Sequence, residues 1–158
     1  IIAAENNGSG VTGVAFNAKI MPVRVLDSSG GTIADIAAGI RYAVDNGADV
    51  INLSLGSRVT SPIDSQAIQY AFDKGVVVVT AAGNDGRLQP DYPGRYATNF
   101  GIAVGAIDRN NTVPFFSNHA GTIPLDYVVA PGVEVLSTFP GNRYESKKGT
   151  SMATPYVS

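Results

Sequence analysis

The fold is decided by Val76-Val-Val-Val-Thr-Ala-Ala82, an apolar stretch near the middle of a chain of 158 residues. The stretch is apolar on both faces, and it lies between Gly75 and Gly83. Such a run is typical of a central strand in a parallel sheet, because helices cover both faces of the sheet there. The surrounding sequence is therefore expected to alternate strands with helices.

Two helices are predicted on the N-terminal side of this stretch. The first begins at Thr32, which forms a capping box with Asp35, and Gly47 supplies its stop. The second begins at Ser61, where Asp64 completes the same kind of box. Apolar side chains recur at helical spacing in both segments, as they do in helices that cover a sheet.

Three strands alternate with these helices, at residues 19–26, 49–55 and 76–82. Pro22 places the first of them at a sheet edge or a bulge. This βαβαβ order predicts a doubly wound, mostly parallel α/β sheet with right-handed crossovers and helices on both faces. Further short strands are predicted at residues 100–107, 127–130 and 133–138.

The composition excludes several classes of protein. The net charge is −2 and the Lys and Arg residues are scattered, so no basic patch for a nucleic-acid backbone is expected. No apolar run reaches the roughly 18 residues of a bilayer-spanning helix, so no membrane partner is expected. The chain has no cysteine, which excludes disulfides, thiol chemistry and zinc ribbons.

A glycine pattern near the N-terminus, Gly8-Ser-Gly-Val-Thr-Gly13, fits the dinucleotide-binding fingerprint. The fingerprint needs a helix that opens at its last glycine. Only residues 14–18 separate this pattern from the next predicted strand, too few for a helical crossover of roughly ten residues. No organic cofactor is therefore expected.

Three glycine-containing motifs lie where an open α/β sheet binds its ligands, at the carboxyl ends of strands and at a helix start. They are Ser54-Leu55-Gly56, Ala82-Gly83-Asn84 and Gly149-Thr-Ser-Met-Ala-Thr-Pro155. The third places a serine in the first turn of a helix, whose exposed N–H groups suit anion stabilisation during acyl transfer. Ordinary turn chemistry and a helix cap remain alternative explanations for each motif taken alone.

Taken together, the motifs resemble signatures of the subtilisin-like serine proteases. Gly149-Thr-Ser-Met-Ala-Thr-Pro155 resembles the nucleophile motif of that family, and Asp49-Val-Ile-Asn-Leu-Ser-Leu-Gly56 and Thr80-Ala-Ala-Gly-Asn84 resemble two others in the same order and spacing. Similar segments at residues 6–15, 103–106 and 129–132 extend the resemblance over essentially the whole chain. The resemblance implies a serine endopeptidase acting on polypeptide substrates.

The resemblance assigns a role to each matching residue. Ser151 would be the nucleophile that forms an acyl-enzyme, and the Asn84 amide would bind the oxyanion together with the Ser151 N–H. One wall of the substrate cleft would be formed by Ser54, Leu55 and Gly56. The pocket for the side chain before the scissile bond would be lined by Thr80, Ala81, Ala82 and Gly83.

Two carboxylates depart from the family pattern. Asp85 and Asp91 fall near the rim and the base of that pocket in the resemblance. One hypothesis is a preference for Lys or Arg before the cut. The alternative is that both are solvated loop carboxylates.

The base and the orienting carboxylate of a serine protease are missing from the matching motifs. His119, the one histidine of the chain, lies in a segment where the family has no catalytic residue, and Ile1-Ile2-Ala3-Ala4 resembles the helix that follows the family's histidine motif. Residues 1–158 are therefore expected to be the C-terminal portion of a catalytic domain that lacks the Asp and His motifs, and to be inactive alone. The alternative is a non-catalytic relative that binds peptides or serves as a scaffold, although a scaffold needs neither Ser151 nor Asn84.

The loop at residues 6–11 resembles the calcium-binding loop of the family. The resemblance implies a structural calcium ion bound by the Asn7 side chain and by the carbonyls of Glu5, Ser9 and Val11. A plain glycine-rich turn is the alternative. The family also implies a secreted, extracellular monomer with a pro-segment inhibitor.

Overall fold

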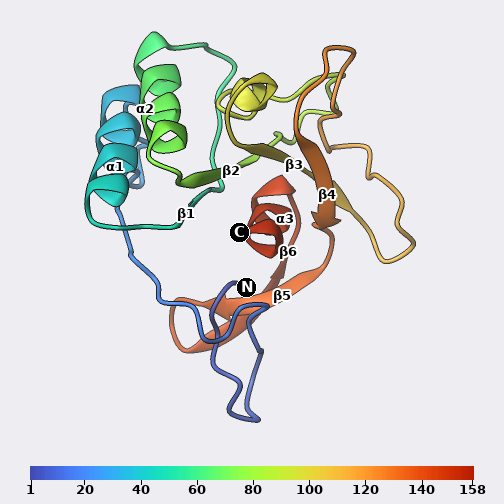
Figure 1. Ribbon diagram of the computed structural model, residues 1–158. Helices are drawn as coiled ribbons and strands as arrows, with labels where there is room; N and C mark the ends of the chain where they lie inside the picture. The colour runs from blue at the N-terminus through green and yellow to red at the C-terminus, as the bar shows by residue number, and fades with distance from the viewer.

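The computed structural model describes residues 1–158, and its core is a four-stranded parallel sheet (Figure 1). The sheet has the order β1-β2-β3-β4 and consists of β1 (Val50–Leu53), β2 (Val77–Ala81), β3 (Ile102–Ile107) and β4 (Tyr127–Pro131). The predicted central stretch is β2, which pairs with β1 on one side and β3 on the other. Its placement confirms the expected mostly parallel α/β sheet.

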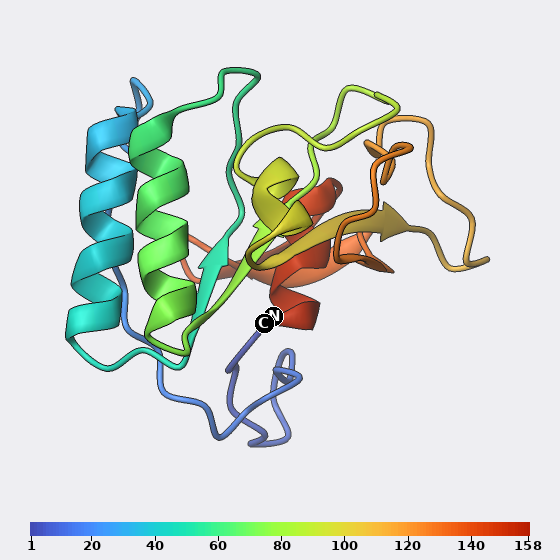
Figure 2. The ribbon, with the colours of Figure 1, turned by 45° about the horizontal axis from the view of Figure 1, so that its top comes forward.

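Helices cover both faces of this sheet. On one face, α1 (Ile33–Asp45) and α2 (Pro62–Asp73) pack side by side, and Val78 belongs to their apolar cluster (Figure 2). On the other face, α3 (Thr150–Val157) packs with Val79. Val78 and Val79 are each 1% exposed, because consecutive strand residues point to opposite faces and both faces are covered.

Three further elements complete the chain. A short 3₁₀ helix, η1 (Gly94–Thr98), precedes β3, and an antiparallel hairpin of β5 (Val135–Phe139) and β6 (Arg143–Lys147) precedes α3. None of the helices has the length and apolarity needed to cross a membrane. The hairpin leads the chain back to the sheet, where α3 begins.

The two predicted capping boxes have different outcomes. At α1 the box is complete, with Thr32 Oγ1 accepting from Asp35 N at 3.1 Å and the Asp35 carboxylate accepting from Thr32 N at 3.2 Å. At α2 the Ser61 hydroxyl caps as expected, but the return bond from Ser61 N goes to the Tyr96 hydroxyl at 2.9 Å. Asp64 therefore stays buried, and its Oδ1 has no hydrogen-bond partner.

Two expectations for the N-terminal third are wrong. Residues 19–26 form no strand, because a groove of about 1170 Å³ separates them from the free edge of β1 and leaves them without a pairing partner. The first four residues form no helix, because the carbonyls of Ile1, Ile2 and Ala4 accept hydrogen bonds from residues 13–15 instead. Ile2 lines the same groove beside β1.

Candidate active site

The predicted nucleophile lies where α3 begins, against the carboxyl end of β1. Gly149 precedes the helix with φ +142, a backbone conformation that a side chain would strain. Ser151 is half-buried, and its Oγ donates to the Ser54 carbonyl at 3.2 Å. In return, Ser54 Oγ donates to the Ser151 carbonyl at 2.9 Å. This reciprocal pair fixes Ser151 at the end of the predicted cleft wall.

The predicted oxyanion donor is fixed beside the nucleophile by the residue between them. Asn84 Oδ1 accepts from Thr150 N at 2.7 Å and from Thr150 Oγ1 at 3.2 Å. Because a backbone N–H can only donate, the atom facing it is the amide oxygen, and the amide nitrogen of Asn84 points away and makes no hydrogen bond within the protein. Thr150 Oγ1 also accepts from Gly83 N at 3.1 Å, which ties the loop after β2 to α3.

These contacts leave two unused donors next to Ser151. One is the amide nitrogen of Asn84. The other is the N–H of Ser151 itself, which lies in the first turn of α3, where helical N–H groups have no carbonyl partner within the helix. One N–H donor at a helix start and one side-chain amide beside it suit a developing negative charge on oxygen.

No base contacts the Ser151 hydroxyl. Its one hydrogen bond goes to a carbonyl, and no histidine or carboxylate side chain bonds to it. His119 is exposed, and its backbone N–H donates to the Arg87 carbonyl at 2.8 Å. It therefore packs with the loop after β2 and makes no hydrogen bond to Ser151. Within residues 1–158, no side chain is placed to act as a base on Ser151.

The predicted cleft wall offers free peptide groups. The N–H and C=O groups of Leu55 and Gly56 make no hydrogen bond within the protein, whereas Ser57 and Tyr92 pair through two bonds of 2.7 and 2.9 Å. An extended peptide can pair with such unpaired groups as an added strand. The wall therefore has the backbone chemistry that the resemblance implies.

The residues predicted to line the opposite wall are mostly buried. Ala81 and Ala82 are 4% and 0% exposed, and the Ala82 carbonyl accepts from Asp91 N at 2.8 Å and from Asn118 Nδ2 at 2.9 Å. Gly83 has φ +110, and a Cβ there would collide with the Asn118 amide and lie 2.5 Å from Asp91 Oδ2. Glycine at this position permits the close approach.

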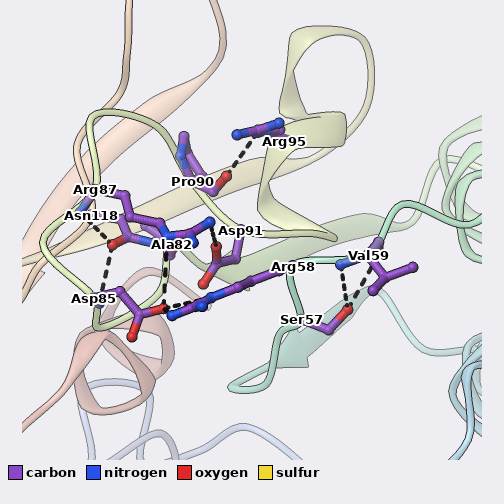
Figure 3. A network of polar contacts seen from close by, with 10 residues as sticks. All are labelled: Ser57, Arg58, Val59, Ala82, Asp85, Arg87, Pro90, Asp91, Arg95 and Asn118. Carbon is purple, nitrogen blue, oxygen red and sulfur yellow. Dashed lines mark hydrogen bonds and ion pairs between the residues drawn. The ribbon is translucent and has the colours of Figure 1, made fainter.

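Asn118 is a positioning residue that the sequence did not reveal. It is fully buried, and its Oδ1 accepts from Asp85 N at 3.1 Å and Arg87 N at 2.9 Å, so it organises the loop that carries Asn84 (Figure 3). Its own carbonyl accepts from the Tyr127 hydroxyl at 2.7 Å. Burial raises the pKa of Tyr127, which keeps that hydroxyl a donor.

The two departing carboxylates have different surroundings. Asp85 is 42% exposed and accepts from Arg58 at 2.9 Å, and this hydrogen bond raises the pKa of the arginine. Asp91 is only 12% exposed and lies between the walls that carry Gly56 and Gly83. The two are therefore not equivalent loop carboxylates.

The candidate calcium loop is exposed and closed on itself. Asn7 Oδ1 accepts from Ser9 N at 3.1 Å, and the Asn7 amide donates to the Glu5 carboxylate at 3.3 Å. Calcium takes six to eight oxygen ligands, and the four expected from Glu5, Asn7, Ser9 and Val11 do not complete that shell. No group of three or more His, Cys, Asp or Glu side chains could hold a metal ion.

Comparison with known proteins agrees with this geometry. The model of the subtilase family, described as Peptidase_S8, matches residues 1–158. The chain belongs to the subtilase family. Among solved structures, this subtilase chain resembles a mutant of the protease domain of PatA, with a TM-score of 0.90 and 31% identity over 99% of this chain and 58% of that one. It also resembles the prenylagaramide maturation protease PagA, with a TM-score of 0.86 and 32% identity.

Curated subtilases match at higher identity. The chain is 49% identical to an alkaline protease of Alkalihalobacillus alcalophilus, covering 99% of this chain and 40% of that protein. It is 48% identical to Subtilisin Savinase of Lederbergia lenta, covering 57% of it, and 47% identical to Thermitase of Thermoactinomyces vulgaris, covering 54% of it. The chain thus spans about half the length of the curated relatives it matches.

Proposed function

We propose that the protein containing this chain is a serine endopeptidase of the subtilisin type. Ser151 Oγ attacks the carbonyl carbon of a peptide bond, and the hydroxyl proton passes to a base and then to the leaving amine. Water then hydrolyses the acyl-enzyme and restores the hydroxyl. The observation that best supports the proposal is the Asn84 amide, which is held by Thr150 so that its nitrogen is free to bind the oxyanion.

The base and its carboxylate come, in this proposal, from a part of the protein outside residues 1–158, and this chain alone is inactive. Two observations support a larger catalytic domain. The relatives extend well beyond the matched region, and the groove beside β1 offers a free edge of a parallel sheet, which other polypeptide normally covers. We propose that an upstream segment of the same protein fills this groove.

The substrate is a polypeptide in extended conformation. Its backbone pairs with the free peptide groups of Leu55 and Gly56, which aligns the scissile carbonyl with Ser151. Of the residues predicted on the facing wall, Gly83 is half-buried and Ala81 and Ala82 are buried, so we place the side chain before the scissile bond against Gly83. Strand pairing contacts the substrate backbone and does not distinguish its side chains. Selectivity for the substrate sequence therefore depends on the residues between the two walls.

The remaining properties are proposals that rest on family membership. Calcium in the loop at residues 5–11 needs ligands beyond Glu5, Asn7, Ser9 and Val11. Secretion to the extracellular space, an inhibitory pro-segment and a monomeric state are proposed from membership of the subtilase family alone.

Hydrolysis by the complete protein tests the proposed activity. The Ser151→Ala variant should lose at least about 10³-fold in kcat on a peptide substrate, because no other group here can form the acyl-enzyme. Ser146→Ala, on the exposed face of β6, is the matched control and should keep full activity.

The absence of a base at Ser151 favours one other function, peptide binding without cleavage. A complete protein that binds peptides but hydrolyses none of them would establish that alternative. Equal hydrolysis by Ser151→Ala and by the unsubstituted protein would exclude Ser151 as the nucleophile.

A further inference from the structure

The Asp91 carboxylate is largely shielded from solvent and has few partners. Its side chain is 12% exposed, and neither carboxylate oxygen makes a hydrogen bond within the protein. Its charged neighbours are Arg87, whose Nη1 lies 3.7 Å from Oδ1, beyond hydrogen-bonding distance, and Arg58, which interacts with it more weakly. Charged groups at this depth normally have hydrogen-bond partners, so Asp91 has unused capacity to bind a cation.

The position of this carboxylate gives it access to substrate. The Asp91 backbone is bonded to the Ala82 carbonyl, and its carboxylate lies beside Gly83, next to the oxyanion donor (Figure 3). On the other side, a Cβ on Gly56 would lie 3.8 Å from the Asp91 Cβ. Asp91 therefore lies between the two walls proposed to hold the residue before the scissile bond.

We infer that Asp91 selects substrates with arginine or lysine immediately before the scissile bond. A carboxylate between two backbone walls suits a long side chain with an apolar stem and a cationic tip. The guanidinium of arginine can occupy both carboxylate oxygens at once, and the lysine ammonium can occupy one. This inference rests on the proposed function, because it names the substrate class of the same site.

The surrounding charges allow a substrate cation to enter. Arg87 lies between the two carboxylates, with Nε 3.9 Å from Asp85 Oδ2 and Nη1 3.7 Å from Asp91 Oδ1. Arg58 donates only to Oδ2 of Asp85, so Oδ1 of Asp85 can still accept a hydrogen bond. A substrate cation that displaces Arg87 from Asp91 therefore leaves Arg87 a partner in Asp85. Arg87 makes no hydrogen bond to Asp91, so a substrate cation that forms hydrogen bonds with this carboxylate can take its place.

The test compares two peptides that differ only in Arg or Phe before the scissile bond, with the complete protein as enzyme. The unsubstituted protein should cleave the Arg peptide with kcat/KM at least about tenfold higher, and Asp91→Asn should lower the Arg-to-Phe ratio by about a hundredfold. Asp73→Asn, at the end of α2, removes the same charge far from the cleft and should leave the ratio unchanged. A Phe preference in the unsubstituted protein, or an unchanged ratio in Asp91→Asn, would overturn the inference.

A binding measurement separates this inference from the proposed activity. In the Ser151→Ala background, calorimetry should show the Arg peptide bound at least about tenfold more tightly than the Phe peptide, and adding Asp91→Asn should remove the difference. Equal or tighter binding of the Phe peptide would contradict the role of Asp91. Selective binding of the Arg peptide without hydrolysis by the unsubstituted protein would uphold Asp91 and overturn only the peptidase proposal.

Discussion

At the scale of single residues, the geometry of one side-chain amide carries most of the argument. Thr150 supplies an N–H and a hydroxyl to the same oxygen of Asn84, directly after Gly149 turns the chain with φ +142 at the start of α3. The amide is thereby oriented before any substrate arrives. Donors fixed in advance stabilise a developing charge without the cost of reorganisation, which is why such a contact matters for rate.

Replacing Asn84 by Asp tests this orientation, because the carboxylate keeps the oxygen that Thr150 binds and loses the N–H donors. We expect kcat to fall by at least about 10²–10³-fold while KM changes little, since the donors act on the transition state. Steady-state kinetics and a melting curve of the complete protein provide the measurements, and the melting temperature should be unchanged. Asn17→Asp adds the same charge on an exposed segment and is the control. A kcat within tenfold of the unsubstituted value would argue against the oxyanion role.

At the scale of elements, the start of α2 shows how a neighbouring side chain can replace a local motif. The Tyr96 hydroxyl accepts from Ser61 N and donates to the Ser61 carbonyl, both at 2.9 Å, so it takes the place that the Asp64 side chain has in a capping box. Asp64 is left 7% exposed with one unpartnered oxygen, and burial raises its pKa. This carboxyl group therefore favours the protonated state when the protein is folded.

The raised pKa predicts how the stability of the protein responds to pH. Below the unfolded pKa of about 3.9, Asp64 is protonated in both states, so Asp64→Asn should have little charge effect there. As pH rises through the higher folded pKa, the unsubstituted protein loses stability relative to Asp64→Asn. Calorimetry from pH 3 to pH 7 should show the melting temperature of Asp64→Asn rising relative to that of the unsubstituted protein. The expected size is about 2–4 °C for each kcal/mol of difference in unfolding free energy. A constant difference across this range would contradict the raised pKa.

The sequence predicts local elements better than contacts between distant segments. An apolar run predicts strand β2, and helical periodicity with N-caps predicts helices α1 and α2. All of these signals are local in the sequence. Residues 19–26 have a strand pattern but no partner, and a strand needs one. Strand β6, Arg-Tyr-Glu-Ser-Lys, was not predicted, because a mostly exposed hairpin strand needs no apolar alternation.

The same distinction holds for the candidate site. Ser151 and Asn84 lie in recognisable motifs, and the structure brings both against Thr150 and Ser54. Asn118 lies 34 positions from Asn84 in a loop without periodicity, so its role in organising residues 82–87 appears only in three dimensions. The contrast between exposed Asp85 and enclosed Asp91 likewise depends on the packing of the two walls.

At the scale of the whole molecule, the chain carries the proposed nucleophile, oxyanion donors and cleft wall on a parallel sheet whose β1 edge is unpaired. The groove of about 1170 Å³ lies on the side of that edge, and the base is absent from the Ser151 hydroxyl. Both features are accounted for together if the remaining part of a subtilase domain covers the edge and brings the base. The activity then belongs to the complete protein and not to residues 1–158 alone.

Covalent labelling of the complete protein by a fluorophosphonate tests the central claim most directly, because the reagent reacts only with an activated serine. Peptide mapping by mass spectrometry should find the adduct on Ser151, and the Ser151→Ala variant should take up no label. An adduct on a different serine, or no adduct in a complete protein that carries the upstream base, would contradict the account.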